Sequence, residues 1–273
     1  MDGPALITGA SAGLGAEFAR ALAGRGHDLR LVARRLDRLE ALADELRQTN
    51  AISVEVRALD LSTSTGLAEC REWVVGDPVG IAVLNAGFGS LGPLELADPD
   101  QQRQMVRVNC GAVADLSQAV IPGMRARGSG QLIIVSSAAA FHPVPYMATY
   151  GATKAFELHF ARALGEELRG TGVGVLAVCP GPTRTEFSEV VTAGGRRGSG
   201  WPSVVAVDDP RTVVASALAA ADRGHSVVST GRVARVTRVG TALLPTAVTL
   251  RVVGAVHRAR SRTPRSAGNT RGI

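Results

Sequence analysis

Short apolar segments rich in β-branched residues alternate with amphipathic helical segments along most of this 273-residue chain. Strands that alternate with helices pair in parallel, because each helix returns the chain to the same end of the sheet. The pattern therefore predicts an α/β fold with a doubly wound, seven-stranded parallel sheet and helices on both faces. The expected strands cover residues 5–8, 28–33, 52–58, 81–84, 131–136, 173–178 and 226–229. The expected helices cover residues 13–24, 36–48, 63–75, 100–127, 146–169 and 209–223.

The chain contains no repeat or linker that would divide its first 231 residues, so we expect one α/β domain over residues 1–231. Glycine-rich residues 186–207 interrupt the alternation and are predicted to form a mobile loop or lid over a substrate site. A disordered surface insertion is the alternative. An apolar helical extension is expected over 232–257, followed by a basic tail over 258–273 whose composition is typical of disorder.

The composition argues against several classes of protein. A hydrophobic fraction of 45% supports a sizeable core, but no apolar run reaches the roughly 20 residues that a membrane span needs. The N-terminal residues lack the pattern of a secretory signal, which favours a cytoplasmic protein. Three widely spaced cysteines predict neither a metal site nor a disulfide framework. The net charge of +6 comes from arginines spread over helical patterns, so we expect no nucleic-acid partner.

A glycine-rich segment, TGASAGLG at residues 8–15, joins the first expected strand to the first helix. Glycines permit a tight turn, let backbone N–H groups approach a pyrophosphate, and let the helix pack closely against the strand. The helix N-terminus also attracts anions. The segment predicts a dinucleotide-binding turn, with a plain tight turn as the alternative.

Arg34 and Arg35 follow the second expected strand, where many dinucleotide-binding folds carry an acidic residue that holds the ribose. Guanidinium groups donate paired, charge-assisted hydrogen bonds to a phosphate. We therefore expect NADP(H) rather than NAD(H) as the cofactor, with Arg34, nearer the strand end, as the better candidate for the 2′-phosphate. The alternative is that both arginines begin the solvated face of the next helix.

Lys154 is the single lysine among the chain's 30 basic residues, the other 29 being arginine. Tyr150 precedes it by four positions in a helical pattern, which places the two side chains on one face. A free tyrosine has a pKa near about 10, and a neighbouring ammonium favours the phenolate. The pair predicts proton transfer at neutral pH, with an exposed helix pair as the alternative. Ser137, at the end of the fifth expected strand, is a candidate to polarise a substrate oxygen.

Taken in order, these motifs resemble those of the short-chain dehydrogenase/reductase family, whose members have a Rossmann-type fold. The resemblance spans about residues 4–231 and rests on the TGASAGLG segment, Asn85-Ala86-Gly87, Asn109, Ser137, the Tyr150–Lys154 unit, and Pro180-Gly181 with Thr185.

The resemblance implies a role for each matching residue. Tyr150 would be the general acid or base, Ser137 would hold the substrate oxygen, Lys154 would bind the nicotinamide ribose and lower the tyrosine pKa, and Asn109 would support a water relay. The implied cofactor contacts are Gly9, Ser11, Gly13, Leu14 and Gly15 at the pyrophosphate, Asp60 and Leu61 at the adenine, Asn85, Ala86 and Gly87 at the adenosine side, and Pro180, Gly181, Thr183 and Thr185 at the nicotinamide.

Two positions depart from the family pattern. Ala12 stands where some NADP-using relatives carry a basic residue, which would leave phosphate recognition to Arg34 and Arg35. Thr183 stands where Val or Ile is frequent.

The expected function is that of an NADP(H)-dependent oxidoreductase that moves a hydride between the nicotinamide and a carbonyl or secondary alcohol. A mainly apolar pocket would favour a hydrophobic ketone, a 3-oxoacyl chain or a steroid-like compound. A non-catalytic dinucleotide-binding sensor is the alternative. The candidate pocket walls are Phe88, Ala138, His142, Tyr146, Met147, Pro182 and Trp201.

The apolar stretch 242–256 has three interpretations: a helix that covers the substrate cleft, part of a subunit contact, or an interfacial membrane helix. We expect a homodimer or homotetramer, with a peripheral membrane contact through 242–260 as a further possibility.

Overall fold

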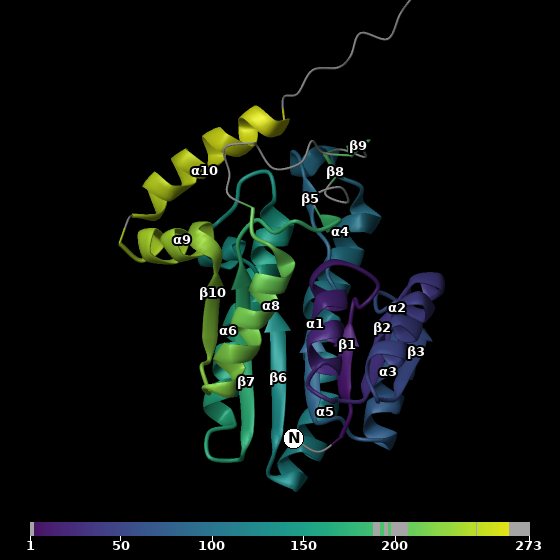
Figure 1. Cartoon of the computed structure of the whole chain (residues 1–273). Helices are drawn as coiled ribbons and strands as arrows, with labels where there is room; N and C mark the ends of the chain where they lie inside the picture. Colours follow the sequence, from purple (N-terminus) through teal and green to yellow (C-terminus); the bar gives the residue numbers. More distant parts are fainter. Residues whose placement is uncertain (1–2, 188–191, 194–195, 198–206, 244, 262–273) are drawn as a thin grey trace, which may run out of the picture.

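The computed structural model describes residues 3–187, 192–193, 196–197, 207–243 and 245–261. Its central element is a seven-stranded parallel sheet with the strand order β10-β7-β6-β4-β1-β2-β3 (Figure 1). The expected doubly wound fold is thus confirmed. The strands are β1 (Ala5–Thr8), β2 (Leu29–Ala33), β3 (Val54–Ala58), β4 (Ile81–Leu84), β6 (Gly130–Val135), β7 (Val173–Pro180) and β10 (Val227–Thr230).

The strand order reverses at β1, which lies between β2 and β4. Ala5 pairs with Leu29 on one side and with Ile81 on the other, both in parallel. The connections that leave β1 and β4 therefore diverge to opposite sides of the sheet. Doubly wound folds bind ligands in the crevice that this divergence opens at the carboxyl ends of the strands.

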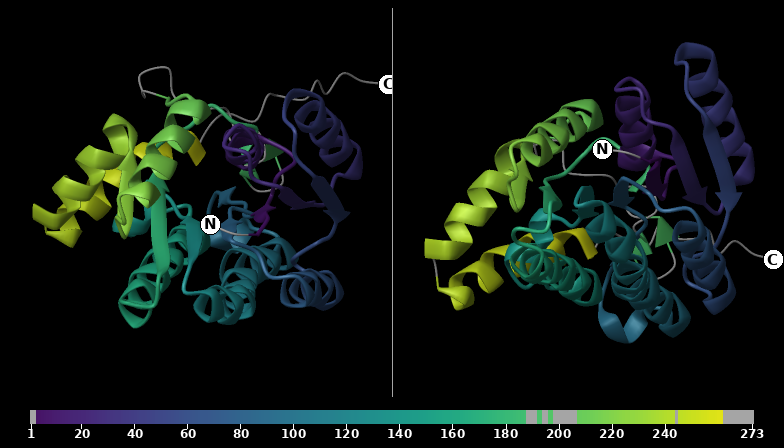
Figure 2. Two further views of the ribbon diagram at one scale, coloured as in Figure 1. Left: turned by 60° about the horizontal axis from the view of Figure 1, so that its bottom comes forward. Right: turned by 90° about the horizontal axis from the view of Figure 1, so that it is seen from below.

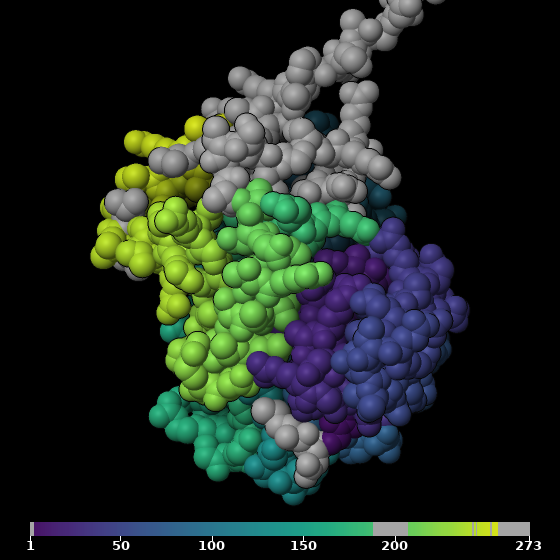
Figure 3. Space-filling view, viewed as in Figure 1, coloured from purple at the N-terminus to yellow at the C-terminus, as the bar shows by residue number. Residues whose placement is uncertain are grey.

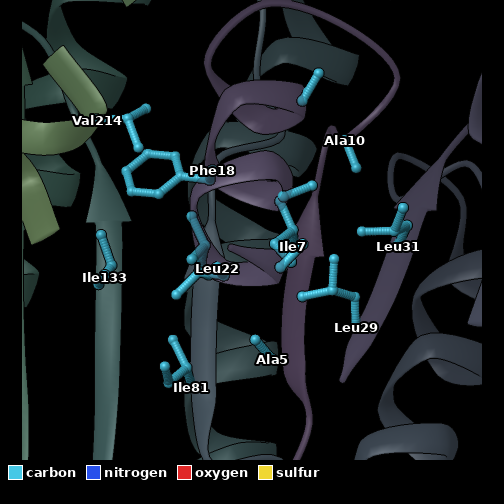
Figure 4. Packing of buried hydrophobic residues seen from close by; sticks show 14 of the residues in the cluster. Ala5, Ile7, Ala10, Phe18, Leu22, Leu29, Leu31, Ile81, Ile133 and Val214 are labelled. Carbon is cyan, nitrogen blue, oxygen red and sulfur yellow. The ribbon is translucent and has the colours of Figure 1, made fainter. Parts of the chain in front are cut away.

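Helices cover both faces of the sheet (Figure 2). One face packs against α1 (Gly13–Ala23), α2 (Leu36–Thr49) and α8 (Pro210–Asp222), and the other against α3 (Ser64–Gly76), α5 (Val113–Arg127) and α6 (Ala148–Glu167). Figure 4 shows Phe18 of α1 reaching toward Val214 of α8 in the first of these layers. Ala5 and Ile7 of β1 lie in one core and Leu6 in the other, which explains why these successive residues are all apolar.

The segment expected as one helix over 100–127 is divided into three parts. Helix α4 (Pro99–Val106) begins after Asp98, whose side chain accepts a hydrogen bond from the Asp100 N–H at 2.9 Å. A turn of π-helix, η2 (Arg107–Ala112), then leads into α5. A π-helical turn keeps the chain in a continuous helical path, so the apolar pattern alone did not reveal it.

Helix α6 begins two residues later than expected. Tyr146 has a φ of +66°, in the left-handed region, and therefore lies before the helix. Short 3₁₀ helices, η1 (Leu94–Leu96) and η3 (Ala138–Phe141), occupy the connections after β5 (Ser90–Leu91) and β6. The expected helical position of Tyr150 and Lys154 is confirmed, since both lie in the first two turns of α6.

Part of the predicted loop at 186–207 forms a second, three-stranded sheet. Strand β5 (Ser90–Leu91) pairs in parallel with β8 (Thr192–Ala193), which pairs in antiparallel fashion with β9 (Arg196–Arg197). The described part of this segment thus joins the loop after β4. Residues 188–191, 194–195 and 198–206, and with them the candidate pocket residue Trp201, lie outside the described residues.

The C-terminal extension consists of two helices rather than the single apolar helix expected at 242–256. Helix α9 (Gly231–Leu243) follows β10 directly, and α10 (Thr246–Ser261) begins just after Pro245, which cannot continue a helix. Helix α10 also runs past residue 258, where the tail was expected to begin, and residues 262–273 lie outside the described part. Figure 3 shows α8 beside α1, with the C-terminal helices on the other side of α8. Among the described residues, no helix has the length and apolarity needed to cross a membrane.

Candidate active site

A cleft of about 570 Å³ opens at the carboxyl ends of the sheet strands. It extends from the glycine-rich turn after β1 to the C-terminal helices, and most of the predicted site residues line it. These are Gly9, Ser11, Gly13, Leu14, Arg34, Arg35, Asp60, Leu61, Asn85, Ala86, Gly87, Phe88, Ser137, Ala138, His142, Met147, Tyr150, Lys154, Pro180, Gly181, Pro182, Thr183 and Thr185.

Three other predicted residues act from behind the cleft surface. A Cβ at Gly15 would lie 2.2 Å from the Gly9 carbonyl oxygen, so this glycine permits the close packing of α1 on the turn. Asn109 is fully buried behind Phe88. Tyr146, expected as a pocket wall, packs instead against the buried cluster that contains Val144, because its backbone turns before α6 begins.

The turn after β1 is fixed by hydrogen bonds from the loop after β4. The Thr8 hydroxyl accepts hydrogen bonds from the backbone N–H groups of Asn85 and Ala86, each at 3.0 Å. The Asn85 amide donates to the carbonyl oxygens of Thr8 and Gly9 at 3.0 and 3.3 Å. Asn85 therefore holds the shape of the glycine-rich turn.

The same turn suits a pyrophosphate. Gly9 has a φ of +67°, and a Cβ there would lie 2.9 Å from the Ala86 Cα, so only glycine fits. Helix α1 starts at Ala12, which has no polar side chain to cap the first N–H groups. Its first turn contains no acidic residue. These free N–H groups and the helix dipole favour an anion at this position.

The two predicted phosphate-binding arginines are placed differently. Arg35 donates to the Ser11 hydroxyl at 3.1 and 3.3 Å, which brings its guanidinium to the glycine-rich turn. Arg34 lies near Asp60; although burial opposes the effect, hydrogen bonds from Ser62 and the charge of Arg34 lower the pKa of Asp60. Both arginines line the cleft, Arg35 at the glycine-rich turn and Arg34 toward Asp60.

Two charged residues that the sequence did not single out complete this corner. The Glu186 carboxylate forms ion pairs with Arg35, at 3.0 Å, and with Arg38. Arg38 lies in the first turn of α2, three residues after the N-cap Arg35. The rim of the cleft therefore contains two cations that share one carboxylate.

The deep end of the cleft brings together Ser137, Tyr150 and Lys154. Tyr150 is buried, with its ring centroid 5.9 Å from Lys154 Nζ. Burial raises the pKa of Tyr150 above its ordinary value, whereas the Lys154 charge and a hydrogen bond with Ser137 lower it. Lys154 thus acts in the expected direction, but burial outweighs it in the free protein.

Lys154 is also buried, and its ammonium is held on two sides. Nζ donates to the Val135 carbonyl oxygen and to Glu157 Oε1, each at 2.9 Å. Burial acts to lower the pKa of Lys154, but Glu157 and Tyr150 together leave it raised. Sequence reasoning missed Glu157, because a glutamate three residues from a lysine usually forms an exposed helix pair.

Asn109 joins the loop after β4 to α6 from its place in the π-helical turn. Its amide nitrogen donates to the Phe88 carbonyl oxygen and to the Thr153 hydroxyl, each at 3.0 Å. Its oxygen accepts from the Phe88 N–H at 3.2 Å. The amide nitrogen and oxygen of Asn109 therefore hold the loop at Phe88 against α6, beside Tyr150.

The wall opposite Lys154 is mainly apolar. Phe187 lies with its ring centroid 5.5 Å from that of Tyr150. Val233 of α9 and Val253 of α10 also line the cleft. Of the three interpretations of the C-terminal stretch, covering the cleft is the one that the position of Val253 supports. Local motifs could not have identified these residues, because they come from elements remote in sequence.

Comparison with known proteins agrees with this arrangement. Residues 4–194 match the family model described as short chain dehydrogenase. The chain belongs to the short-chain dehydrogenase family. It is 31% identical to a short-chain dehydrogenase from Sphingobium yanoikuyae, solved in complex with NADPH; the TM-score is 0.78, over 98% of this chain and 99% of that one. The bulky-bulky ketone specific alcohol dehydrogenase from Comamonas testosteroni is 29% identical, with a TM-score of 0.73 over 98% and 97% of the two chains.

Among curated proteins, a very-long-chain 3-oxoacyl-CoA reductase from Podospora anserina is 35% identical over 191 residues, which cover 68% of this chain and 56% of the relative. The corresponding Bos taurus protein is 30% identical over 68% of this chain and 61% of its own length. The chain thus matches a little over half the length of these relatives.

Proposed function

We propose that this protein is an NADP(H)-dependent oxidoreductase that interconverts a carbonyl compound and a secondary alcohol. The observation that carries the proposal is the convergence of Ser137, Tyr150 and Lys154 at the deep end of a cleft that begins at an anion-favouring glycine-rich turn. Two similar proteins, a very-long-chain 3-oxoacyl-CoA reductase and a bulky-bulky ketone specific alcohol dehydrogenase, support it. Residues 1–231 form the catalytic domain in this proposal, and α9 and α10 complete its cleft.

The side chains present fit a nicotinamide dinucleotide phosphate along the whole cleft. The glycine-rich turn and Ser11 receive the pyrophosphate, and Arg35 receives the 2′-phosphate, with Arg34 beside Asp60 toward the adenine. Leu61, Asn85, Ala86 and Gly87 line the adenosine side. The segment from Pro180 to Thr185 lines the nicotinamide end.

When bound, NADPH would supply the hydride for carbonyl reduction. The Ser137 hydroxyl holds the substrate oxygen within reach of Tyr150. The Tyr150 phenol gives its proton to that oxygen, and in the reverse direction its phenolate accepts the proton. Lys154, fixed by Val135 and Glu157, directs its positive charge toward the phenol and stabilises the phenolate. Asn109 supports the return of a proton from solvent by keeping the loop at Phe88 in place.

The substrate class follows from the wall opposite Lys154. Phe88, Ala138, Met147, Pro182 and Phe187 offer apolar surface, and Val233 and Val253 extend it toward the C-terminal helices. Burial of a substrate's hydrocarbon groups against these side chains favours binding, whereas a sugar would find few hydrogen-bonding partners there. We therefore place the substrate among hydrophobic ketones, including 3-oxoacyl and steroid-like compounds, with His142 at the entrance as a pocket residue.

An exposed apolar face of the C-terminal helices is proposed as a contact surface. Val236, Val239 and Leu243 of α9 are 71%, 59% and 78% exposed. Monomeric proteins seldom expose such groups together. We propose that copies of the chain associate here as a homodimer or homotetramer in the cytoplasm. Sedimentation at several concentrations tests the association, and salt-sensitive pelleting with anionic liposomes would instead indicate a peripheral membrane contact through 242–260.

The decisive experiment measures NADPH oxidation with a bulky aryl ketone, a 3-oxoacyl thioester, a steroid ketone and a keto sugar. We expect turnover with at least one of the first three and little with the sugar. Tyr150→Phe should lower turnover by about a thousandfold while NADPH still quenches protein fluorescence as before. Parent-like turnover by this variant would overturn the mechanism. NADPH binding without any oxidation, across the panel, would favour the non-catalytic sensor.

A further inference from the structure

Glu157 is a buried carboxylate to which the proposed mechanism gives only the task of holding Lys154. It lies three residues after Lys154 in α6 and is 1% exposed. Its two oxygens are each 2.9 Å from Lys154 Nζ, one by a hydrogen bond and the other by an ion pair. The fold therefore brings a second ionisable group into contact with the lysine that faces Tyr150.

The surroundings of Glu157 supply little else to satisfy a carboxylate. Oε2 is fully buried and, among the described residues, forms no hydrogen bond, so its one partner is the ion pair with Lys154. The Glu157 charge raises the pKa of Tyr150 in α6, of Cys110 in η2 and of Cys179 in β7. Among the described residues, Lys154 is the titratable group that shifts the pKa of Glu157 itself. Burial raises the pKa of Glu157 to about 7, even though Lys154 opposes the rise.

A buried acid at this position needs a reason, because an apolar side chain of similar size would avoid the cost of desolvation. Burial of an ionisable group beside reacting groups is most frequent at functional sites. An ammonium has three protons to donate. Val135 and Glu157 take two of them, which leaves one for the cleft. Glu157 thus fixes the orientation of Lys154 and also offsets its charge.

We propose that Glu157 is a positioning residue that sets how strongly Lys154 acts on Tyr150, and thereby the pH range in which Tyr150 exchanges its proton. The inference rests on the proposed function. Glu157 needs no contact with the substrate for this role. Its negative charge weakens the field of the ammonium at the phenol, so the phenol holds its proton more tightly. Removing that charge should make Tyr150 the stronger acid.

The first test follows Tyr150 directly and needs no substrate. The chain has two tyrosines, so in a Tyr146→Phe background the tyrosinate absorbance reports Tyr150 alone. We expect Glu157→Gln to move the midpoint of a rapid pH-jump titration to lower pH by about one unit, a tenfold loss of proton affinity. Superimposable curves for the E157Q protein and its parent would overturn the proposal.

The matched control is Glu166→Gln, which removes a carboxylate from the same helix at an exposed position paired with Arg169. It should leave the titration unchanged. If Glu157→Gln does not fold, Glu157→Met, which leaves no unpaired amide in the core, carries the same measurement. A merely structural role would lower the yield or the melting temperature of these variants without moving the midpoint.

The second test uses turnover. With a substrate in hand, the acidic limb of kcat/KM for alcohol oxidation should move to lower pH in Glu157→Gln by the same tenfold factor. A uniform loss at every pH would contradict the tuning role. If the parent oxidises no alcohol, the proposed function fails while the tyrosinate titration still decides the inference, so the two failures can be told apart.

Discussion

The floor of the cleft, formed by Asn109, Tyr150, Lys154 and Glu157, is built differently from its rim. All four floor residues are buried. Their polar atoms are held by backbone groups or by one another, as in the bonds of 2.9 Å from Lys154 to Val135 and Glu157. Tyr150, Lys154 and Glu157 come from α6, which packs on the sheet, and Asn109 comes from η2, which packs on α6. Their positions are therefore fixed by the same contacts that fold the protein.

The rim, formed by Arg35, Arg38 and Glu186, consists of exposed and flexible side chains. They are 40% to 45% exposed and meet through ion pairs at the surface. Such pairs contribute little to stability, because water and salt screen them. A substitution in the floor should therefore alter stability and catalysis together, whereas a substitution in the rim should alter ligand preference alone.

The largest effect is expected for Lys154→Arg, which retains the positive charge at the floor. The guanidinium is larger and planar, and the buried pocket between Val135 and Glu157 is shaped for a compact ammonium. We expect NADPH-dependent reduction to fall by about a hundredfold or more, with about 2 kcal/mol less stability from overpacking. Turnover and chemical denaturation measure the two effects.

The control for this substitution is Arg169→Lys, which exchanges the same two residue types just beyond the end of α6 at an exposed ion pair. It should change stability by no more than about 0.5 kcal/mol. If Lys154→Arg changed turnover and stability as little as Arg169→Lys does, the proposed difference between the floor and the rim would be wrong.

A second prediction concerns the pH dependence of stability. The pKa of Glu157 is raised to about 7, so the folded protein holds this proton more tightly than the unfolded chain does. The resulting stabilisation is complete below the unfolded pKa and is lost as the pH rises through about 7. Relative to Glu157→Gln, the parent should lose about 3 kcal/mol of unfolding free energy between about pH 4 and pH 8.

Urea titrations of both proteins across this range provide the measurement. The difference between the two reports the loss of the Glu157 carboxylate together with its effect on the pKa of Lys154. A difference that stays constant with pH would mean that Glu157 keeps an ordinary carboxyl pKa. Burial of its ionised form would then not destabilise the folded protein.

The fold could be predicted closely because its strands are buried on both faces and separated by helical periods. Every main sheet strand lies within two residues of its expected bounds. The errors occur where the pattern carries no local signal. The π-helical turn η2, for example, keeps the apolar rhythm of its neighbours, whereas the break between α9 and α10 does have a local signal in Pro245.

The candidate site also contains residues that a local pattern identified and residues that only the tertiary structure shows. Ser137, Tyr150 and Lys154 were found because their spacing within one strand end and one helix is a local property. Glu157 has the spacing of a surface ion pair, and only the packing of α6 shows that it is buried. Phe187 could be placed beside Tyr150 only by the tertiary structure. The roles proposed for all of these residues stay predictions.

At the rim, Arg35→Ala should alter cofactor preference without altering the fold. Arg35 contacts the Ser11 hydroxyl at the glycine-rich turn, where a 2′-phosphate would gain charge-assisted hydrogen bonds. We expect a tenfold to hundredfold loss of NADPH affinity, on the order of 2 kcal/mol, and little change for NADH. Arg34→Ala should have the smaller effect, and Arg25→Ala, at an exposed pair with Asp222, should have no effect.

Isothermal titration with both cofactors measures these affinities. An equal loss of NADPH and NADH would show that Arg35 supports the turn rather than the phosphate. A larger effect of Arg34→Ala than of Arg35→Ala would restore the assignment that the sequence favoured.

The smallest effect is expected for Glu186→Gln, because it removes only a screened surface charge. Glu186 occupies the guanidinium groups of Arg35 and Arg38 in the free protein, so a phosphate must compete with it. The neutral amide should tighten NADPH binding by about threefold, within the 1 kcal/mol or less that exposed ion pairs contribute. The gain should shrink as salt rises, since the same ions screen the competing carboxylate.

Asp222→Asn removes a carboxylate from another exposed arginine and should leave NADPH binding unchanged. Weaker binding in Glu186→Gln would mean that the carboxylate orients the arginines for the phosphate, and the rim would then be preorganised like the floor.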